Sequence, residues 1–152
     1  MRSRRRLLEE SRAKKNRMTQ LEYAKNNKLT HLMRKIAQGE GIAPQSLLQY
    51  IKEGRIVLLK NKIHSIPKPC AVGYSLRTKV NSNLGTSTDK SQVKDELEKL
   101  AVSIKYGADT VMDLSVGGNL KAIRKKILES STIPIGTVPV YEIAVNAQKK
   151  RG

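Results

Sequence analysis

The sequence predicts an α/β protein in which a small helical region precedes a parallel sheet. From residue 70 onward, apolar strand-like runs alternate with amphipathic helical segments, and this alternation is typical of βαβ units. Before residue 70, the apolar residues recur at helical spacing instead. Aromatic residues are scarce, with five Tyr and no Phe or Trp, so the core must be aliphatic. That composition suits helices packed on parallel strands.

The length of the chain limits the fold. At 152 residues with 38% hydrophobic content, it is long enough for one ordinary domain. It is too short for a complete eight-stranded α/β barrel, which typically has about 250 residues. No apolar run approaches the roughly 20 residues of a membrane helix, and Leu7 and Leu8 form too short a run for a secretory signal. The single Cys70 cannot form an internal disulfide. We therefore expect a cytoplasmic protein with no membrane partner.

The net charge of +17 is concentrated at the two ends of the chain. Residues 1–17 contain eight basic and two acidic residues, and residues 148–152 contain three basic residues. Such clusters can bind nucleic acid by neutralising phosphates. The N-terminal segment, however, has no aromatic side chain to stack on bases. We interpret residues 1–17 as a disordered basic extension and residues 148–152 as a basic tail, with nucleic-acid contact as the alternative.

Residues 18–69 are predicted to form a mainly helical N-terminal region. One apolar helical stripe ends at the glycines of residues 39–41, and a second helix has Pro44 in its first turn and Gly54 as its stop. The two stripes consist of Leu29, Leu32, Met33 and Ile36, and of Leu47, Leu48 and Ile51. A strand at residues 56–59 and an irregular connector containing Pro67 and Pro69 complete the region.

Residues 70–147 are predicted to contain three strands and two intervening helices. The strands are expected at residues 76–82, 109–114 and 133–141. The first helix is expected to begin at Thr88 or Asp89, both good N-cap residues. The inward-facing residues of the two helices, at helical spacing, are Val93, Leu97, Leu100, Ala101 and Ile104, and Leu120, Ile123, Ile127 and Leu128.

Three residues recur at equal intervals near the ends of these strands. Asn83, Met112 and Tyr141 are separated by 29 residues each, and each lies close to the carboxyl end of its expected strand. In parallel α/β barrels the functional site is assembled at that end, because the loops that follow the strands converge on one rim. An Asn amide can donate and accept hydrogen bonds, Met offers a soft apolar contact, and Tyr combines an apolar face with a polar tip.

Three segments resemble successive motifs of the phosphomethylpyrimidine synthase family, in order and in spacing. They read KVNSNLGTS at residues 79–87, YGADTVMDLS at residues 106–115 and PIGTVPVY at residues 134–141. The resemblance covers about residues 18–147 and concerns only the N-terminal portion of the family. It implies the first three βα units of a TIM-like (β/α)8 barrel, incomplete in this chain. It also assigns Asn83, Met112 and Tyr141 to the substrate site.

The family to which these segments are similar makes the pyrimidine of thiamine. Its members are carbon–carbon lyases that convert aminoimidazole ribotide into hydroxymethylpyrimidine phosphate by radical S-adenosylmethionine chemistry, with a 4Fe-4S cluster and zinc. A radical cluster of this kind needs three closely spaced thiolates, whereas this chain has only Cys70. His31 and His64 lie on different expected elements and do not suggest a metal site. We therefore expect no catalytic residue, no metal ligand and none of these cofactors on this chain, which should be inactive alone.

Two hypotheses follow from these observations. In the first, the chain is a truncated or split synthase that retains part of the ribotide site. It would work only with a complementing C-terminal chain that carries the rest of the barrel and the cysteine motif. In the second, it is a basic nucleic-acid-binding module derived from the same fold.

Overall fold

The computed structural model describes residues 18–61 and 66–151. The predicted basic extension, residues 1–17, and His64 lie outside the described residues. The chain divides into two units, with the boundary between Val57 and Leu58.

The first unit is helical, as the apolar spacing predicts. Its helices are α2 (Gln20–Lys25), α3 (His31–Glu40) and α4 (Pro44–Lys52), and α4 packs against both α2 and α3. The buried side chains that hold these helices together are Ala24, Met33, Ile36, Ala37, Leu47, Leu48 and Ile51. Most of the two predicted apolar stripes therefore form this core.

Local hydrogen bonds fix where these helices begin and end. Thr19 and Glu22 form a reciprocal capping box at the start of α2. The Thr30 hydroxyl accepts the Met33 N–H at 3.2 Å and starts α3, which leaves Leu29 outside the helix. Gly41 ends α3 in the left-handed conformation, with a φ of 68°.

A two-stranded sheet follows, formed by β1 (Ile56–Leu59) and β2 (Cys70–Gly73). β1 confirms the predicted strand, and the described part of the predicted connector, residues 66–69, has no helix or strand. β2 is not anticipated by the sequence reasoning. Cys70 lies within it and is buried.

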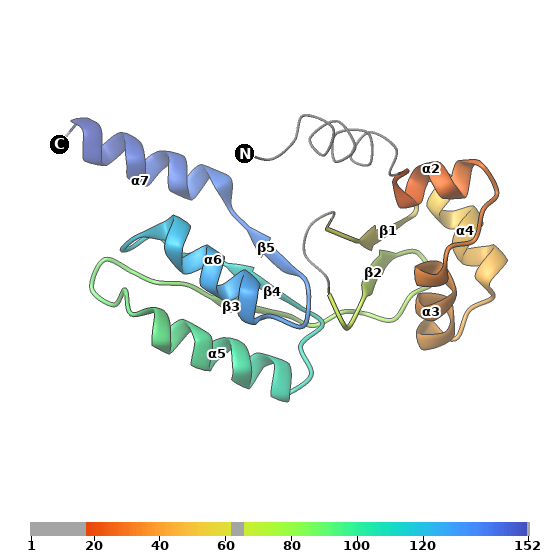
Figure 1. Cartoon of the computed structure of the whole chain (residues 1–152), viewed down its shortest axis with the longest axis horizontal. Helices are drawn as coiled ribbons and strands as arrows, with labels where there is room; N and C mark the ends of the chain where they lie inside the picture. The colour runs from red at the N-terminus through yellow and green to blue at the C-terminus, as the bar shows by residue number, and fades with distance from the viewer. Residues whose placement is uncertain (1–17, 62–65, 152) are drawn as a thin grey trace, which may run out of the picture. The chain divides into compact units, whose positions relative to one another are not determined.

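The second sheet is parallel and has the order β3-β4-β5. Its strands are β3 (Asn81–Leu84), β4 (Thr110–Asp113) and β5 (Ile135–Thr137). In the register of the sheet, Asn83 pairs with Met112, and Met112 pairs with Gly136. Figure 1 shows these strands side by side, and they confirm the predicted α/β class and parallel sheet.

One face of this sheet is covered by α5 (Val93–Lys105) and α6 (Leu120–Ser130). Because side chains alternate along a strand, Leu84 and Val111 point to this face. They join helix residues in a core that consists of Leu84, Leu100, Val111, Ile123, Ile127 and Ile133. The aliphatic core that the composition requires therefore lies between the sheet and these two helices.

The last helix, α7 (Pro139–Arg151), leaves the end of β5 (Figure 1). The Arg124 guanidinium of α6 donates to the Glu142 carboxylate of α7 at 2.7 Å. Val140 and Ile143 on α7 are 60% and 66% exposed. The helix is therefore held to α6 by an ion pair while apolar side chains remain open to solvent.

Three predicted boundaries are wrong. The first strand is not residues 76–82 but β3, because sheet pairing starts where the Val80 carbonyl accepts the N–H groups of Asp109 and Thr110. The first helix begins at Val93 rather than Thr88 or Asp89, because Ser87 and Lys90 close a turn through two hydrogen bonds. The third strand does not reach residue 141.

The third strand is short because a helix follows it almost at once. β5 ends at Thr137, and α7 starts at Pro139. Proline suits the first position of a helix, since its fixed φ fits and its missing N–H is not needed there. Tyr141 therefore belongs to a helix and not to the end of a strand.

Candidate functional site

The sheet face opposite α5 and α6 carries a polar ladder. Asn81 Nδ2 donates to Asn83 Oδ1 at 3.1 Å, and Thr110 Oγ1 donates to Asn81 Oδ1 at 2.8 Å. The intervening residue, Ser82, points to the other face, where its hydroxyl contacts that of Ser103 on α5 at 2.8 Å. Asn83 is therefore held on the face that the two core helices leave uncovered.

Met112 lies next to Asn83 on the same face, because the two residues are register partners in adjacent parallel strands. A Cβ atom at the next register position, Gly136, would lie 2.9 Å from Met112 Sδ and 3.0 Å from its Cε. The Met112 side chain therefore extends over Gly136, and any larger residue at position 136 would restrict the space that the Met112 side chain occupies.

Of the three predicted site residues, the structure brings two together. Asn83 and Met112 are adjacent in the sheet, as the 29-residue interval predicts. Tyr141 lies in the first turn of α7, where its N–H donates to the Val138 carbonyl at 3.1 Å and its side chain is 41% exposed. The register partner of Met112 on β5 is Gly136, five residues before Tyr141.

The loops that follow β3 and β4 are hydrogen-bonded to each other at the carboxyl end of the sheet. Thr86 Oγ1 donates to the Gly117 carbonyl at 2.8 Å, and the Thr86 N–H donates to Ser115 Oγ at 3.1 Å. The Ser115 hydroxyl in turn donates to Asp113 Oδ1 at 2.5 Å. Thr86, Asp113 and Ser115 are all buried. Backbone pairing also continues past the strands, since the Val116 N–H donates to the Thr86 carbonyl at 2.9 Å.

A second buried carboxylate supports the same end of β3. Glu96, 2% exposed, accepts the Gly85 N–H at 2.7 Å and the Lys99 ammonium at 2.7 Å. Sequence reasoning misses this residue. A signal for it exists, because Glu96 lies three residues after Val93 and four before Leu100, and so falls on the apolar face of the helix. Asp113, the buried last residue of β4, is missed as well.

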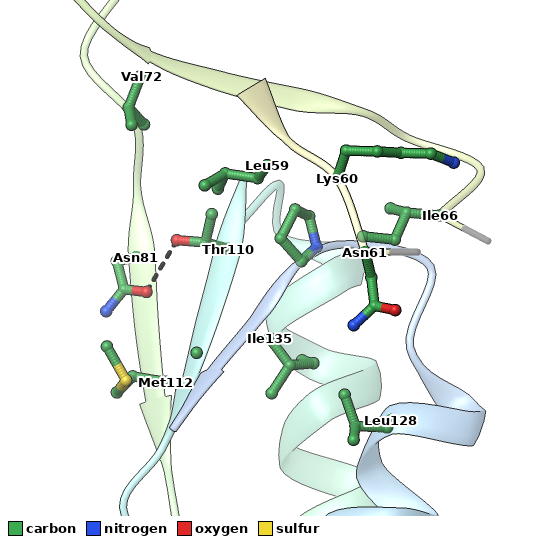
Figure 2. A pocket seen from close by; sticks show the side chains of 12 residues that line it. Leu59, Lys60, Asn61, Ile66, Val72, Asn81, Thr110, Met112, Leu128 and Ile135 are labelled. Carbon is green, nitrogen blue, oxygen red and sulfur yellow. Dashed lines mark hydrogen bonds between the residues drawn. The ribbon is translucent and has the colours of Figure 1, made fainter. Parts of the chain in front are cut away.

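A hollow of about 530 Å³ lies at the amino end of the sheet. Figure 2 shows Asn81 and Met112 at one side of it, Leu128 of α6 at the other, and Ile135 of β5 between them. Its full lining is Leu59, Lys60, Asn61, Ile66, Val72, Asn81, Thr110, Met112, Leu128, Pro134, Ile135 and Gly136. Most of this lining is apolar, so the hollow suits a hydrophobic partner better than a charged ligand.

The described residues contain no group of three or more His, Cys, Asp or Glu side chains placed to hold a metal ion. Cys70 is buried in β2, and His31 is exposed at the start of α3. Across residues 18–61 and 66–151, no helix combines the length and the apolar character needed to cross a membrane.

Comparison with known proteins gives a consistent result. Residues 19–152 match the sequence profile of the Radical SAM ThiC family. The chain is 51% identical over 135 residues to the phosphomethylpyrimidine synthase of Thermodesulfovibrio yellowstonii, covering 89% of this chain and 32% of the relative. It is 50% identical over 127 residues to the enzyme of the same name from Pyrococcus abyssi, covering 84% and 30% respectively. It is 49% identical over 135 residues to the phosphomethylpyrimidine synthase of Thermus thermophilus, covering 88% of this chain and 31% of the relative.

The chain therefore spans about a third of the length of the curated relatives it matches. The matched region begins directly after the N-terminal basic segment and includes the three segments on which the resemblance rests. That resemblance is confirmed, and this chain belongs to the Radical SAM ThiC family.

Proposed function

We propose that this chain supplies the N-terminal part of a phosphomethylpyrimidine synthase of thiamine biosynthesis, as a truncated or split form of the enzyme. The observation that carries the proposal is the identity of about 50% to synthases of which the chain covers only 30–32%. In this proposal, residues 18–69 are the helical N-terminal region and residues 70–147 are the first βα units of an incomplete TIM-like barrel. The parallel β3-β4-β5 sheet supports that assignment.

The chain contributes part of a site for aminoimidazole ribotide through Asn83, Met112 and Tyr141. Asn83 Oδ1 already accepts from Asn81, so the exposed Asn83 amide can use its Nδ2 group to donate to a polar group of the substrate. Met112 beside it offers a polarizable apolar contact for a heterocycle. Tyr141 is the third contact, contributed from α7 and not from a strand.

The cofactors of the family do not fit the donor set of this chain. A 4Fe-4S cluster that binds S-adenosylmethionine requires three thiolates, and the chain has one cysteine, which is buried in β2. In this proposal, the ligands of the cluster and of zinc lie in the part of the synthase beyond the matched region, and we expect no lyase activity without that part. The same proposal places the protein in the cytoplasm, where its single thiol stays reduced.

The alternative function, nucleic-acid binding, is not favoured by a specific observation. The family match starts at residue 19, after the first basic cluster, and the relatives named above are synthases. We therefore retain the synthase assignment.

A complementation experiment tests this proposal. The full chain is produced together with the C-terminal two-thirds of the Thermodesulfovibrio yellowstonii synthase in a thiamine auxotroph that lacks its own enzyme. We expect growth without thiamine to require both polypeptides. Asn83→Ala should abolish growth, whereas Val102→Ala, at an exposed position on α5, should leave it unchanged. Growth that is equally strong with Asn83→Ala would refute the proposed substrate contact.

A further inference from the structure

We propose that Asn81 and Thr110 position the Asn83 side chain so that its amide donates a hydrogen bond at the proposed substrate site and does not accept one. Asn81 and Thr110 are positioning residues, because they act through Asn83 and not on the substrate itself. This inference rests on the proposed function. It adds the polarity of the contact, and with it the kind of substrate group that Asn83 can bind.

The three side chains of this polar ladder lie on one face of the sheet. Asn81 and Asn83 are two residues apart on β3, and side chains at that spacing point to the same side. Thr110 is the register partner of Asn81 on β4. Ser82, between the two asparagines, points to the opposite face, where its hydroxyl contacts that of Ser103. The strand backbones therefore hold the three polar groups side by side.

Two hydrogen bonds connect the ladder in one direction. Thr110 Oγ1 donates to Asn81 Oδ1 at 2.8 Å, as Figure 2 shows, and Asn81 Nδ2 donates to Asn83 Oδ1 at 3.1 Å. The first bond turns the Asn81 oxygen toward Thr110. Because the oxygen and the nitrogen of an amide share one carbon atom, the Asn81 nitrogen is then free to face Asn83. The orientation of the first amide therefore sets that of the second.

The ladder ends in a donor. Asn83 Oδ1 is occupied by Asn81, and within residues 18–61 and 66–151 no group accepts from Asn83 Nδ2. The Asn83 side chain is exposed, so a ligand can reach that nitrogen. An amide NH₂ group has two N–H donors and does not accept. A ligand that binds here must therefore present an atom with an available lone pair.

This polarity restricts how aminoimidazole ribotide can lie at Asn83. The ribotide has acceptors in its phosphate and ribose oxygens and in its unprotonated ring nitrogen. Its exocyclic amino group, in contrast, is a donor, since its lone pair is delocalised into the ring. One of the acceptors therefore faces Asn83, and the amino group is directed elsewhere.

A single substitution should reverse the ladder. Asn81→Asp keeps the shape of the side chain but has no amide N–H, so it cannot donate to Asn83. Its carboxylate accepts instead, and it attracts the Asn83 Nδ2 group through a charge-assisted hydrogen bond. The Asn83 oxygen then points outward, where it opposes an acceptor of the ligand.

Side-chain NMR on the full chain tests the ladder without any ligand. In Asn81→Asp, an Asn83 Nδ2 proton should move downfield, because it now donates to a carboxylate. Thr110→Ser keeps the hydroxyl and should leave the Asn83 signals in place. Thr110→Val has nearly the same shape but no donor, so the two orientations should mix and give intermediate signals. With all variants folded by circular dichroism, Asn83 signals that are unchanged in both Asn81→Asp and Thr110→Val would overturn the inference.

Titration with aminoimidazole ribotide, followed at the Met112 methyl group, tests the consequence for binding. Asn81→Asp should weaken binding by about tenfold or more, since a hydrogen bond is replaced by two opposed acceptors. Thr110→Val should weaken it by about twofold, because the apparent affinity scales with the fraction of molecules that present the donor. Thr110→Ser should bind like the original chain. The valine variant adds no charge, so its loss cannot come from repulsion of the phosphate. Equal affinity in all variants would contradict the inference.

The ladder and the proposed function fail separately. If the ribotide moves no signal of the original chain, the proposed substrate site is refuted, and the Asn83 signals of the ligand-free variants still decide whether Asn81 and Thr110 orient the amide. If the ribotide binds but the ligand-free variants keep the original Asn83 signals, the site stands and the positioning role is refuted.

Discussion

Gly117→Ala should break hydrogen bonds between the two loops that follow β3 and β4 at the carboxyl end of the parallel sheet. A Cβ atom at this position would lie 1.8 Å from the Ser87 carbonyl oxygen and 2.3 Å from its carbon, so backbone must move. The movement breaks the bond from Thr86 Oγ1 to the Gly117 carbonyl and leaves a hydroxyl buried without a partner. An unsatisfied buried hydroxyl costs about 1–3 kcal/mol, and forced overpacking costs about 1–3 kcal/mol more. We therefore expect a loss of about 2–6 kcal/mol in the stability of this sheet.

The assay is amide hydrogen exchange, read residue by residue. In Gly117→Ala, exchange should accelerate most at the Val116 N–H, whose acceptor is the Thr86 carbonyl of the facing loop. Gly39→Ala is the matched control, because the same methyl group there meets no atom within 4 Å and lies in α3. That control should stabilise its helix by about 0.5–1 kcal/mol. Unchanged exchange at Val116 in the Gly117 variant would refute the argument.

Two further predictions concern the parallel sheet and the residues just before its strands. The Arg77 side chain, hydrogen-bonded to Asp109, holds the pKa of that carboxyl below its ordinary value of about 3.9. The pair therefore stabilises the fold at pH values above the ordinary pKa. This stabilisation is lost as the pH falls through the lowered pKa. Arg77→Gln should therefore shift acid unfolding to higher pH, and an unchanged transition measured by circular dichroism would contradict this. Gly136→Ala should displace the Met112 side chain, seen as a changed methyl chemical shift, with little loss of stability because the contact is with the flexible end of that side chain. A methyl signal that stays in place would show that Met112 does not pack over Gly136.

Local signals explain which elements could be predicted. Helices α3 and α4 have complete apolar stripes with a cap, a proline or a terminal glycine at their ends, and both are predicted close to their observed bounds. β2 has only four residues, Cys-Ala-Val-Gly, with no alternation to distinguish it from a loop. The start of α5 depends on a turn closed by the Ser87 hydroxyl, a contact that propensity at Thr88 and Asp89 does not reveal.

The candidate site shows the same division between local and non-local information. The interval of 29 residues gives the correct register for Asn83 and Met112, because one strand, one helix and their loops fill that interval. From Met112 the next register partner, Gly136, is only 24 residues away. Equal spacing therefore places Tyr141 beyond the strand. The Pro139 that starts α7 is the signal that could have corrected this.

The buried carboxylates connect the core to the proposed site. Each strand divides its residues between two faces, and Asn83 and Met112 lie on the face without core helices, so packing in the core does not hold them in place directly. Their position depends on the strand ends, where Glu96 binds the Gly85 backbone and Asp113 binds Ser115. Both carboxylates are nearly inaccessible to water, so each hydrogen bond to them is strong and costly to break. These strand-end hydrogen bonds can therefore keep Asn83 and Met112, the two proposed substrate contacts on the sheet, in register.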